Sequence, residues 1–436
     1  MVGLARSGRA AARWLAGQGI AVYASDAANT PAVRAVAAEL AGLGVAVDVG
    51  RHDLARIRRA AAAVVSPGVP PGAPPVAAAR EVGVEVVAEL DLGARALATA
   101  RLVVVTGTNG KSTTTALVAH LLTVGGLRAE AAGNIGRPLI ELADRNEADW
   151  IAVEASSFQL HDAPHLAPAV GVVTNLAPDH LDRYPDATAY YADKRLLFRN
   201  ADDDSTWVLN GDDDAVLELA GGVQGRRALF RLAGPADAWL DRSGNRLMLD
   251  RRPLLPRDAL QLLGDHNVAN ALAAALAARA AGVAPGAIAR GLGTFHSLRH
   301  RLEPVREVHG VLWINDSKAT NVSAAACALR AVTRPIVLVA GGRDKGEPFV
   351  FLAPLIRQRC RAVVAYGEAR AALSRDLGAA VPGLLAVEAF DDAVREAGRQ
   401  ARPGDAVLLA PACASFDQFE HYEARGDRFR ALVEAL

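Results

Sequence analysis

LVVVTGTNGKSTTT, residues 102–115, is the stretch that decides the fold, because an apolar β-branched run breaks into a glycine turn and then into a hydroxyl-rich helix start. This order predicts a strand, a phosphate loop and a helix. Backbone N–H groups around Gly107, Asn109 and Gly110, together with the positive end of the helix, would surround a polyphosphate. We therefore expect a nucleotide to bind at this turn, with ATP as the working assumption.

Two side chains of the turn carry its chemistry. Lys111 would reach the outer phosphates, and Ser112 would offer its hydroxyl to Mg²⁺. The spacing is a compact variant of the usual phosphate loop, since Val105 stands where the first glycine of GxxxxGK[ST] is expected. The alternative is a tight strand-to-helix turn with a surface lysine, but strand, glycines, lysine and serine all fall in the order that phosphate binding needs.

Length and charge restrict the class of protein. The 436 residues are enough for about three domains of ordinary size. The 48 Lys and Arg residues balance the 48 Asp and Glu residues, which leaves no overall field to attract nucleic acid or an anionic membrane. No apolar run in the sequence approaches the roughly 20 residues of a membrane span. We therefore expect a small-molecule enzyme that neither binds nucleic acid nor inserts into a membrane.

The three cysteines indicate a compartment. Cys327, Cys360 and Cys413 are an odd number without the spacing of a metal site, which favours buried thiols in a reducing cytoplasm. The N-terminus has arginines and no acid before Asp26, as a transit peptide does. We prefer to interpret it as part of a folded strand–helix unit.

The lysines are unusually few. Only four of the 48 basic residues are lysines, namely Lys111, Lys194, Lys318 and Lys345. A chain this rich in Arg keeps Lys mainly where a compact point charge or a deprotonatable amine is needed. Each lysine is therefore a candidate site residue.

The chain opens with a glycine turn and a helix. VGLARSGRAAARWLAGQG, residues 2–19, has Gly3 and Gly8 in the places of a dinucleotide-type unit, but Ala5 where the middle glycine is usual. Only Met1 and Val2 precede the turn, whereas a strand normally has more residues. We expect that Met1 is not the natural start or that the first domain is loosely held.

Two later features of this first α/β unit point to ligand contact. Asp26 ends a predicted strand at about the distance where an acid meets a ribose or uridine. SPG, residues 66–68, lies where another strand ends, before a stiff proline-rich loop. Simple helix and turn capping is the alternative for both.

A second α/β unit follows the phosphate loop. GNIG, residues 133–136, is a turn that places the amide of Asn134 near a ligand. Glu154 ends the apolar strand WIAVE, where phosphate-loop enzymes keep a metal-binding acid. His180 lies in a loop after another strand, at the edge where open α/β sheets collect ligands. A lone histidine in such a loop is as often structural.

Three further segments of this unit have two interpretations each. Lys194 lies on a predicted helix between Asp193 and Arg195, as a solvated lysine or as a site residue. The acidic runs 202–204 and 212–214 are predicted to be solvated turns rather than metal sites. The helix at 262–278 presents His266, Asn267 and Asn270 on one face, either toward a nucleotide or as caps.

Near Arg299 the pattern of strands and helices starts again. VLWIND leads to SKATN, PIVLVAGG leads to RDKG, and DAVLLAPA leads to CASFDQF. This alternation predicts a third unit with a parallel sheet and crossover helices. Lys318 and Lys345 both fall in loops after strand ends, which is the ligand-binding edge of such a sheet.

With these pieces placed, the chain resembles the Mur ligase family along almost its full length. Four strings carry the resemblance: TGTNGKST at 106–113, SSFQL at 156–160, NDSKATN at 315–321 and PACASFDQF at 411–419. The last two are the most specific, because family members that add other amino acids look different there. The resemblance implies an α/β fold of three domains: a Rossmann-like N-terminal domain for a UDP substrate (1–98), a phosphate-loop ATPase domain (99–298) and a Rossmann-like C-terminal domain for the amino acid (299–436).

The resemblance also implies roles for individual residues. The ATP-binding set is Gly107, Thr108, Asn109, Gly110, Lys111, Ser112, Thr113, Asn267, Asn270, Arg301 and Asp316. Residues that border the UDP-sugar substrate are Ser7, Asp26, Ser66, Gly68 and Asn134, and those of a D-glutamate pocket are Lys318, Thr320, Lys345, Ser415 and Tyr422. Ser112 and Glu154 would hold one Mg²⁺, and His180 and a carbamylated Lys194 a second. The expected catalytic residues are Lys111, Glu154, His180 and Lys194.

The implied activity is ATP-dependent joining of D-glutamate to UDP-N-acetylmuramoyl-L-alanine through an acyl phosphate, in peptidoglycan precursor synthesis, by a cytoplasmic monomer. The sequence departs from the family at Tyr422, where an aromatic without a hydroxyl is common, and at the shortened strand before Arg6 and Ser7. Another Mur ligase or a folylpolyglutamate-type ligase is the alternative activity. A regulatory module without catalysis is a third possibility, but the joint presence of Lys111, Glu154, His180 and Lys194 speaks against it.

Overall fold

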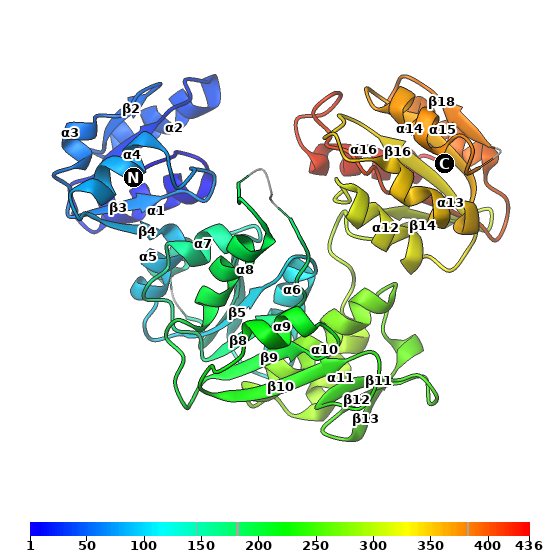
Figure 1. The fold of residues 1–436 in the computed structure, drawn as a ribbon, viewed down its shortest axis with the longest axis horizontal. Coiled ribbons are helices and arrows are strands. Elements are labelled where there is room, and N and C mark those ends of the chain that lie inside the picture. Colours follow the sequence, from blue (N-terminus) through cyan, green and yellow to red (C-terminus); the bar gives the residue numbers. More distant parts are fainter. Residues whose placement is uncertain (146, 180–182, 382) are drawn as a thin grey trace. The chain divides into compact units, whose positions relative to one another are not determined.

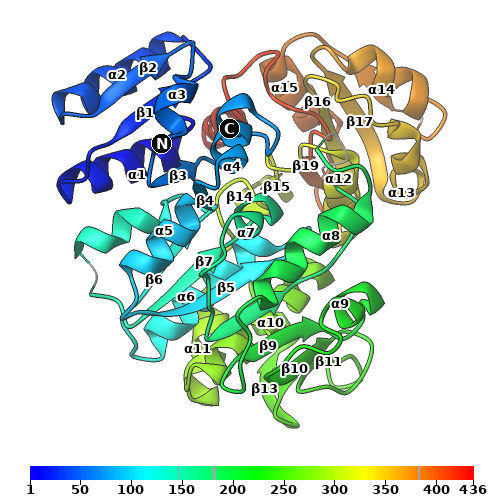
Figure 2. The same cartoon turned by 60° about the vertical axis from the view of Figure 1, so that its left-hand side comes forward.

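A computed structural model describes residues 1–145, 147–179, 183–381 and 383–436. The chain forms two compact units, Met1–Leu260 with Val268–Thr294, and Gln261–Asn267 with Phe295–Leu436. Both are built of β-sheets covered by helices, which confirms the predicted α/β class (Figure 1, Figure 2). His180, a predicted site residue, lies outside the described residues.

The first unit begins with two parallel strand pairs. The strands are β1 (Tyr23–Asp26) with β2 (Ala46–Val49), and β3 (Ala62–Val65) with β4 (Glu85–Ala88). Val2 bridges in parallel to Ser25 of β1 and to Val65 of β3. The amino group of Met1 donates to the carbonyl of Tyr23 at 2.6 Å. The first residues thus occupy the place between the two pairs where the sequence predicted a shortened strand.

Small side chains allow the helices of this region to pack closely. Ala10, Ala11 and Ala12 are buried on the first helix. The second helix is capped by Thr30, whose hydroxyl accepts the N–H of Val33 at 3.3 Å. The helices are α1 (Arg6–Gly17), α2 (Pro31–Gly42), α3 (Leu54–Ile57), α4 (Pro74–Glu81) and α5 (Glu89–Ala96).

A nine-stranded sheet forms the rest of the first unit, in the order β13-β12-β11-β10-β9-β8-β5-β7-β6. Its strands are β5 (Arg101–Thr106), β6 (Ala129–Gly133), β7 (Trp150–Glu154), β8 (Val170–Val173), β9 (Thr206–Asn210), β10 (Arg226–Arg231), β11 (Ala238–Asp241), β12 (Arg246–Leu249) and β13 (Arg252–Pro256). The neighbouring strands among β5 to β11 all pair in parallel. Strands β12 and β13 add an antiparallel extension that the sequence analysis did not predict.

The central strand β5 is buried along its length after Arg101, as the continuous run Leu102–Thr106 predicts for a strand covered on both faces. The long helix that follows it buries Leu117, Val118, Leu121 and Leu122. The helices of this region are α6 (Lys111–Val124), η1 (Leu139–Arg145), α7 (Ser157–His161), α8 (Ala187–Arg195), η2 (Leu196–Phe198), α9 (Asp214–Leu219), η3 (Arg257–Ala259), α10 (Asp265–Ala280) and α11 (Pro285–Thr294).

The second unit contains a six-stranded sheet in the order β14-β15-β19-β16-β17-β18. Its strands are β14 (Glu303–Val308), β15 (Val311–Asn315), β16 (Ile336–Gly341), β17 (Cys360–Tyr366), β18 (Leu384–Ala386) and β19 (Ala406–Leu409). Only the β14–β15 pair is antiparallel among these. The carboxyl ends of β15, β16 and β19 therefore meet at one edge, where the sequence predicted ligand contacts.

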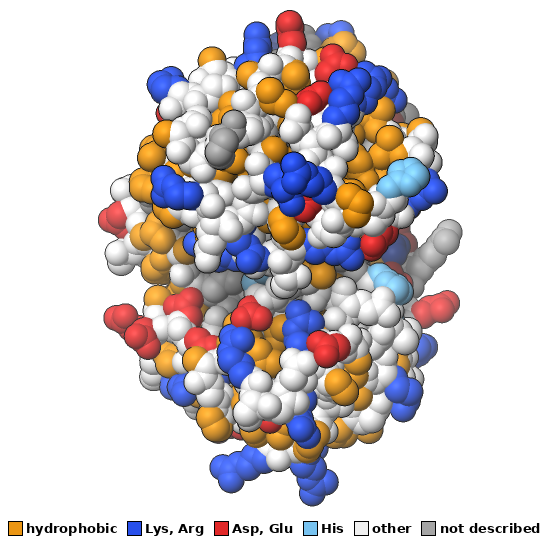
Figure 3. Space-filling model, turned by 90° about the vertical axis from the view of Figure 1, so that its right-hand side faces the viewer, with side chains coloured by type: hydrophobic (Ala, Val, Ile, Leu, Met, Phe, Trp, Pro, Cys, Tyr) orange, Lys and Arg blue, Asp and Glu red, His pale blue; other side chains and the backbone are white. Residues whose placement is uncertain are grey.

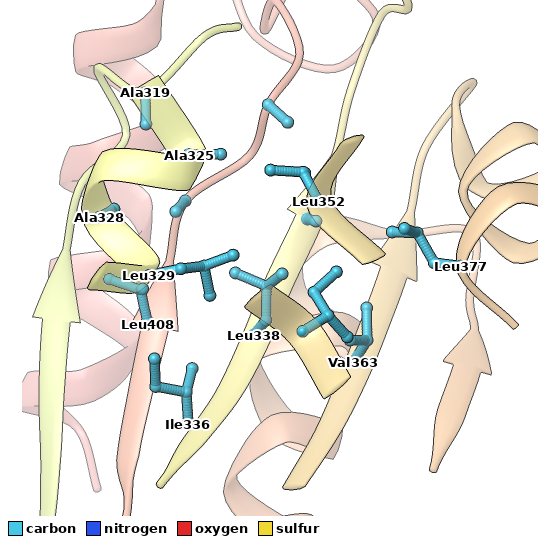
Figure 4. Packing of buried hydrophobic residues seen from close by; sticks show 14 of the residues in the cluster. Ala319, Ala325, Ala328, Leu329, Ile336, Leu338, Leu352, Val363, Leu377 and Leu408 are labelled. Carbon is cyan, nitrogen blue, oxygen red and sulfur yellow. The ribbon is translucent and has the colours of Figure 1, made fainter. Parts of the chain in front are cut away.

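Helices cover both faces of this sheet. Leu329, from the first helix, packs with Leu338 and Leu408 of the strands (Figure 4), while Trp313 and Phe429 belong to the core on the other face. The helices are α12 (Val322–Ala331), η4 (Phe349–Leu352), α13 (Ala353–Arg359), α14 (Arg370–Leu377), α15 (Phe390–Gln400) and α16 (Tyr422–Glu434).

The surface agrees with the balanced charge of the sequence. Basic and acidic side chains are interspersed over the face drawn in Figure 3. Among the described residues, none of the helices combines the length and the apolar character that crossing a membrane requires.

Candidate active site

The phosphate loop forms where the sequence predicted it, between the end of β5 and the start of α6. Gly107 and Gly110 take positive φ values of 138° and 83°. A Cβ atom would lie 2.0 Å from Oγ1 of Thr174 at Gly107 and 2.3 Å from Oδ1 of Asn270 at Gly110. Glycine is therefore required at both positions by the backbone conformation and by the neighbours.

Residues after β8 hold the loop in place. Oγ1 of Thr174 donates to the carbonyl of Asn109 at 2.6 Å, and the N–H of Asn109 donates to Oδ1 of Asn175 at 2.9 Å. The N–H of Asn109 was expected to face phosphate, but here it is donated to that side chain. Asn175 is a site residue that the sequence analysis missed, because only the fold brings the end of β8 beside the loop.

The two buried or half-buried lysines of the first unit meet at one carbonyl. Nζ of Lys111 donates to the carbonyl oxygens of Gly107 at 3.0 Å and Thr108 at 2.8 Å. Nζ of Lys194 donates to the same Gly107 oxygen at 2.8 Å. Lys194 lies on α8, far along the chain, so this pairing supports its place in the phosphate site.

Lys194 is only 1% exposed, and its ammonium lies 4.5 Å from the centre of the Tyr190 ring. Burial and then the nearby charge of Lys111 lower the pKa of Lys194 well below its ordinary value, while Asp179, Asp193 and Glu154 oppose this. The interpretation as a solvated lysine is therefore wrong. Burial therefore shifts this group toward the neutral amine, which is the form that reacts with CO₂.

Glu154 ends β7 and is 2% exposed. Nδ2 of Asn134 donates to its Oε1 at 2.9 Å, but its Oε2 has no hydrogen-bond partner among the described residues. A buried carboxylate oxygen without a partner is costly, and a cation would compensate it. This oxygen fits Mg²⁺, which prefers oxygen ligands, and Ser112, the second predicted ligand, lies in the first turn of α6.

Over the described ranges, no group of three or more histidine, cysteine or carboxylate side chains has the spacing to hold a metal ion. In the acidic runs that the sequence predicts to be turns, Asp202 accepts from Ser205 and Asp213 caps α9.

A second missed residue, Arg183, connects the segment between β8 and α8 to the SPG loop. Its guanidinium donates to the carbonyls of Pro67 at 3.1 Å and Val69 at 3.2 Å and lies 3.8 Å from the centre of the Phe158 ring. Ser66, a predicted substrate contact, lines a small cavity of about 30 Å³ with Arg183. The contact gives the predicted substrate loop a fixed neighbour.

Asp26 is placed on a larger cavity of about 1080 Å³, which Arg6, Arg9 and Arg137 also line. Its carboxylate accepts the N–H groups of Leu4 at 2.7 Å and Ala28 at 2.8 Å. Asp26 therefore holds the glycine turn as well as bordering the cavity, so both interpretations of this residue stand. Ser7 lies in the first turn of α1, and Gly68 follows β3.

The second unit carries the predicted D-glutamate residues. Nζ of Lys318 lies 4.1 Å from the centre of the Tyr422 ring, and Ser415 is buried beyond the end of β19. Thr320 follows in the Lys318 loop, with its N–H on the carbonyl of Lys318 at 2.8 Å. Lys345 is exposed in the loop after β16. These residues thus follow β15, β16 and β19 or begin α16.

The predicted nucleotide residues are divided between the units. Asn270 accepts from Thr114 of α6 at 3.3 Å and lies at the phosphate loop. Asn267, Arg301 and Asp316 belong to the second unit. Asp316 accepts the N–H of Leu302 at 3.2 Å, and burial raises its pKa to about 7.

Arg425 of α16 is a further residue that the sequence analysis missed. It is fully buried, and its guanidinium donates to the carbonyls of Ser317 at 2.8 Å and Cys413 at 3.2 Å. It also donates to Oγ of Ser317 at 2.9 Å. The side chain ties together two of the loops that carry the predicted D-glutamate contacts.

Three family models match the chain. They are the Mur ligase MurD-like N-terminal domain at residues 1–88, the Mur ligase middle domain at 105–278 and the glutamate ligase domain of Mur ligases at 300–413. Curated relatives match over the whole chain. A UDP-N-acetylmuramoylalanine–D-glutamate ligase from Salinibacter ruber is 44% identical and one from Gloeobacter violaceus 43%, covering 100% of this chain and 97% and 98% of theirs.

Solved structures share the fold. The UDP-N-acetylmuramate–alanine ligase from Thermotoga maritima superposes with a TM-score of 0.65 at 19% identity, covering 100% of this chain and 98% of that one. A pseudomurein peptide ligase type C from Methanothermus fervidus gives a TM-score of 0.62 at 20% identity, with the same coverage. At such identities the likeness concerns architecture alone.

Proposed function

The chain belongs to the Mur ligase family, and we propose that it joins D-glutamate to UDP-N-acetylmuramoyl-L-alanine with the hydrolysis of ATP. The observation that carries this is the full-length identity of 44% to a ligase named for that reaction. The conformation of the phosphate loop, with Lys111 and Glu154 at its edge, supports an active enzyme rather than a binding module.

The reaction needs activation because a carboxylate is a poor acyl donor. The carboxylate of the substrate's alanine attacks the γ-phosphorus of ATP, and ADP leaves. The amine of D-glutamate then attacks the acyl carbon, inorganic phosphate leaves, and the amine loses a proton as the amide forms. Two anions must meet in line in the first step, so the site has to stabilise negative charge.

The phosphate loop supplies that stabilisation. Lys111, which lies over the carbonyls of Gly107 and Thr108, would turn its ammonium toward the outer phosphates. Ser112 and Glu154 would hold Mg²⁺, which when bound neutralises phosphate charge. Asn134 would keep Glu154 oriented toward the ion and face the substrate on its other side. Asn270 and the remaining loop residues would border the nucleotide.

Lys194 is proposed to act as a carbamate. Its burial and lowered pKa favour the neutral amine. The amine nitrogen would form a bond to the carbon of CO₂ and lose a proton to solvent, and the resulting carbamate anion would hold a second Mg²⁺ together with His180. Arginine would not serve here, because a guanidinium does not ordinarily form a carbamate.

The substrates are assigned to the ends of the chain. Asp26, Ser66 and Gly68, with Ser7, would border the UDP-sugar, and Lys318, Thr320, Lys345, Ser415 and Tyr422 would surround D-glutamate. Asn267, Arg301 and Asp316 would complete the nucleotide site. The proposed domains are residues 1–98, 99–298 and 299–436. The protein is proposed to be a monomer in the cytoplasm.

The test is ADP release by the purified protein with UDP-N-acetylmuramoyl-L-alanine. D-Glutamate should support turnover, while L-glutamate, L-lysine and folates with glutamate should not. Equal turnover with L-glutamate or L-lysine would assign the chain to another branch of the family. ATP hydrolysis of any kind excludes the regulatory module.

A further inference from the structure

The segment before β14 holds a strained turn around Arg301. His300 and Leu302, on either side of it, have left-handed φ values of 63° and 44°. Residues with a Cβ seldom take this conformation, and each instance costs about 1–3 kcal/mol. Such a turn persists only where its surroundings hold it, so the groups that hold it are informative.

Glu303 holds the turn from within the second unit. The residue is 7% exposed, and its Oε2 accepts the N–H of His300 at 2.8 Å and Nδ2 of Asn315 at 3.2 Å. Its Oε1 accepts from the guanidinium of Arg430 on α16, which neutralises the buried carboxylate. The side chain therefore joins the turn, the end of β15 and α16.

The turn is also tied to the loop after β15. The carbonyl of His300 accepts the N–H of Lys318 at 3.1 Å, and the N–H of Leu302 donates to Oδ1 of Asp316 at 3.2 Å. A change in the backbone conformation at His300 would consequently change the position of the next residue, Arg301. The neighbouring contacts of Asp316 and Lys318 would change with it.

We infer that Glu303 is a positioning residue, which holds His300 in its left-handed conformation and thereby fixes the backbone from which the Arg301 side chain extends. It acts through Arg301 and not on the substrates. The inference rests on the proposed function, because Arg301 is assigned to ATP there. Its test uses nucleotide binding, which does not depend on the identity of the amino acid that is joined.

The experiment is a double-mutant cycle on the full chain, with the affinity for a non-hydrolysable ATP analogue and Mg²⁺ measured by calorimetry. Arg301→Ala and Glu303→Ala should each weaken binding by about tenfold, and the double variant should bind no more than about twofold weaker than Arg301→Ala. Glu307→Ala is the matched control, since this exposed acid of β14 pairs with Arg334 at 3.0 Å. It should leave the affinity unchanged.

A rescue variant separates positioning from simple loss of stability. In Glu303→Gln with Arg430→Ala, the amide oxygen can accept from His300 while the NH₂ group takes the space that the guanidinium left. This variant should bind the analogue within about threefold of the parent chain, although both changes remove charges. Glu303→Gln alone should bind more weakly, because its NH₂ group faces Arg430.

Three results would overturn the inference. They are additive losses in the cycle, an unchanged affinity of Arg301→Ala, and a Glu303→Ala chain that melts earlier but binds the analogue normally. A chain that binds the analogue as expected but does not join D-glutamate would overturn the proposed function and leave the inference standing.

Discussion

Asn134 donates its side-chain amide to Oε1 of Glu154 at 2.9 Å, and this leaves the other carboxylate oxygen of a buried acid without a hydrogen-bond partner in the described part of the chain. The two residues come from adjacent parallel strand ends, because β6 pairs with β7. The amide fixes the direction of the carboxylate. The oxygen without a partner marks the direction in which a cation is expected.

Asn134→Ala should therefore weaken the use of Mg²⁺. Loss of a group that orients a metal ligand costs about 10–100-fold in metal affinity or activity. We expect the Mg²⁺ concentration for half-maximal ADP release to rise by about tenfold or more. Glu130→Ala, on the strand β6 that precedes Asn134 and paired with Arg137 at the surface, is the control and should behave as the parent chain. An unchanged Mg²⁺ requirement in Asn134→Ala would contradict the orienting role.

The sequence predicted the parts of this site that follow from local order. A β-branched run, glycines and a Lys-Ser pair predicted the loop between β5 and α6. The apolar run that ends in Glu154 predicted an acid at the end of a strand. The scarcity of lysine singled out Lys194, which the structure buries, and its role in the site stays a prediction. The Asn134–Glu154 pair itself needs the order of strands in the sheet, which local patterns do not contain.

Other missed features share that physical reason. Asn175, Arg183 and Arg425 act through contacts between segments far apart in the chain, and each resembles an ordinary polar residue in its own segment. The antiparallel strands β12 and β13 were missed because they are only four and five residues long and β13 contains two prolines. Tertiary pairing decides their conformation, not the local apolar pattern.

Glu89 gives a prediction for the pH dependence of stability. It begins α5, its Oε1 accepts the N–H of Ile140 at 2.8 Å, and burial raises its pKa to about 7. The folded chain thus keeps this proton up to about pH 7, whereas the unfolded chain releases it near the ordinary value of 4.5. The free energy of unfolding should fall as the pH rises between these values, and the loss should be complete above pH 7.

Glu89→Gln removes that loss, because the amide keeps the acceptor for Ile140 and carries no charge. At pH 8 the variant should be more stable than the parent chain by about 1–3 kcal/mol, and at pH 4.5 the two should be nearly equal. Urea unfolding at both pH values measures this. Glu81→Gln, an exposed change beside Arg58, should show no such dependence. A Glu89→Gln chain that gains nothing at pH 8 would show that Glu89 is ionised at little cost.

Arg183→Ala should weaken binding of the UDP substrate. The guanidinium holds the carbonyls of Pro67 and Val69, so its loss frees the loop that carries Ser66 and Gly68. We expect KM for UDP-N-acetylmuramoyl-L-alanine to rise by about tenfold with KM for ATP nearly unchanged. Arg199→Ala, an exposed change after η2, is the control. Equal rises in both KM values would indicate general loosening instead.

Lys194 gives the most decisive prediction, because the chemistry proposed for it excludes the usual conservative replacement. An unperturbed lysine at pH 7.5 is neutral in only about one part in a thousand. The burial of this side chain and its lowered pKa increase that fraction. Lys194→Arg should keep ATP binding but lose ligation, since a guanidinium does not form a carbamate. Lys194→Ala should regain part of its activity when a small carboxylate such as acetate is added.

Two measurements keep this prediction independent of folding. The melting temperature of each variant shows whether the buried site tolerates the change, and Arg195→Lys is the matched control on the same helix, expected to stay active. Carbon-13 NMR of the parent chain in labelled bicarbonate should show a carbamate resonance that Lys194→Ala lacks. A fully active Lys194→Arg enzyme would refute the carbamate. The buried ammonium would then have a structural role, because it donates to the carbonyl of Gly107 and so holds the phosphate loop in place.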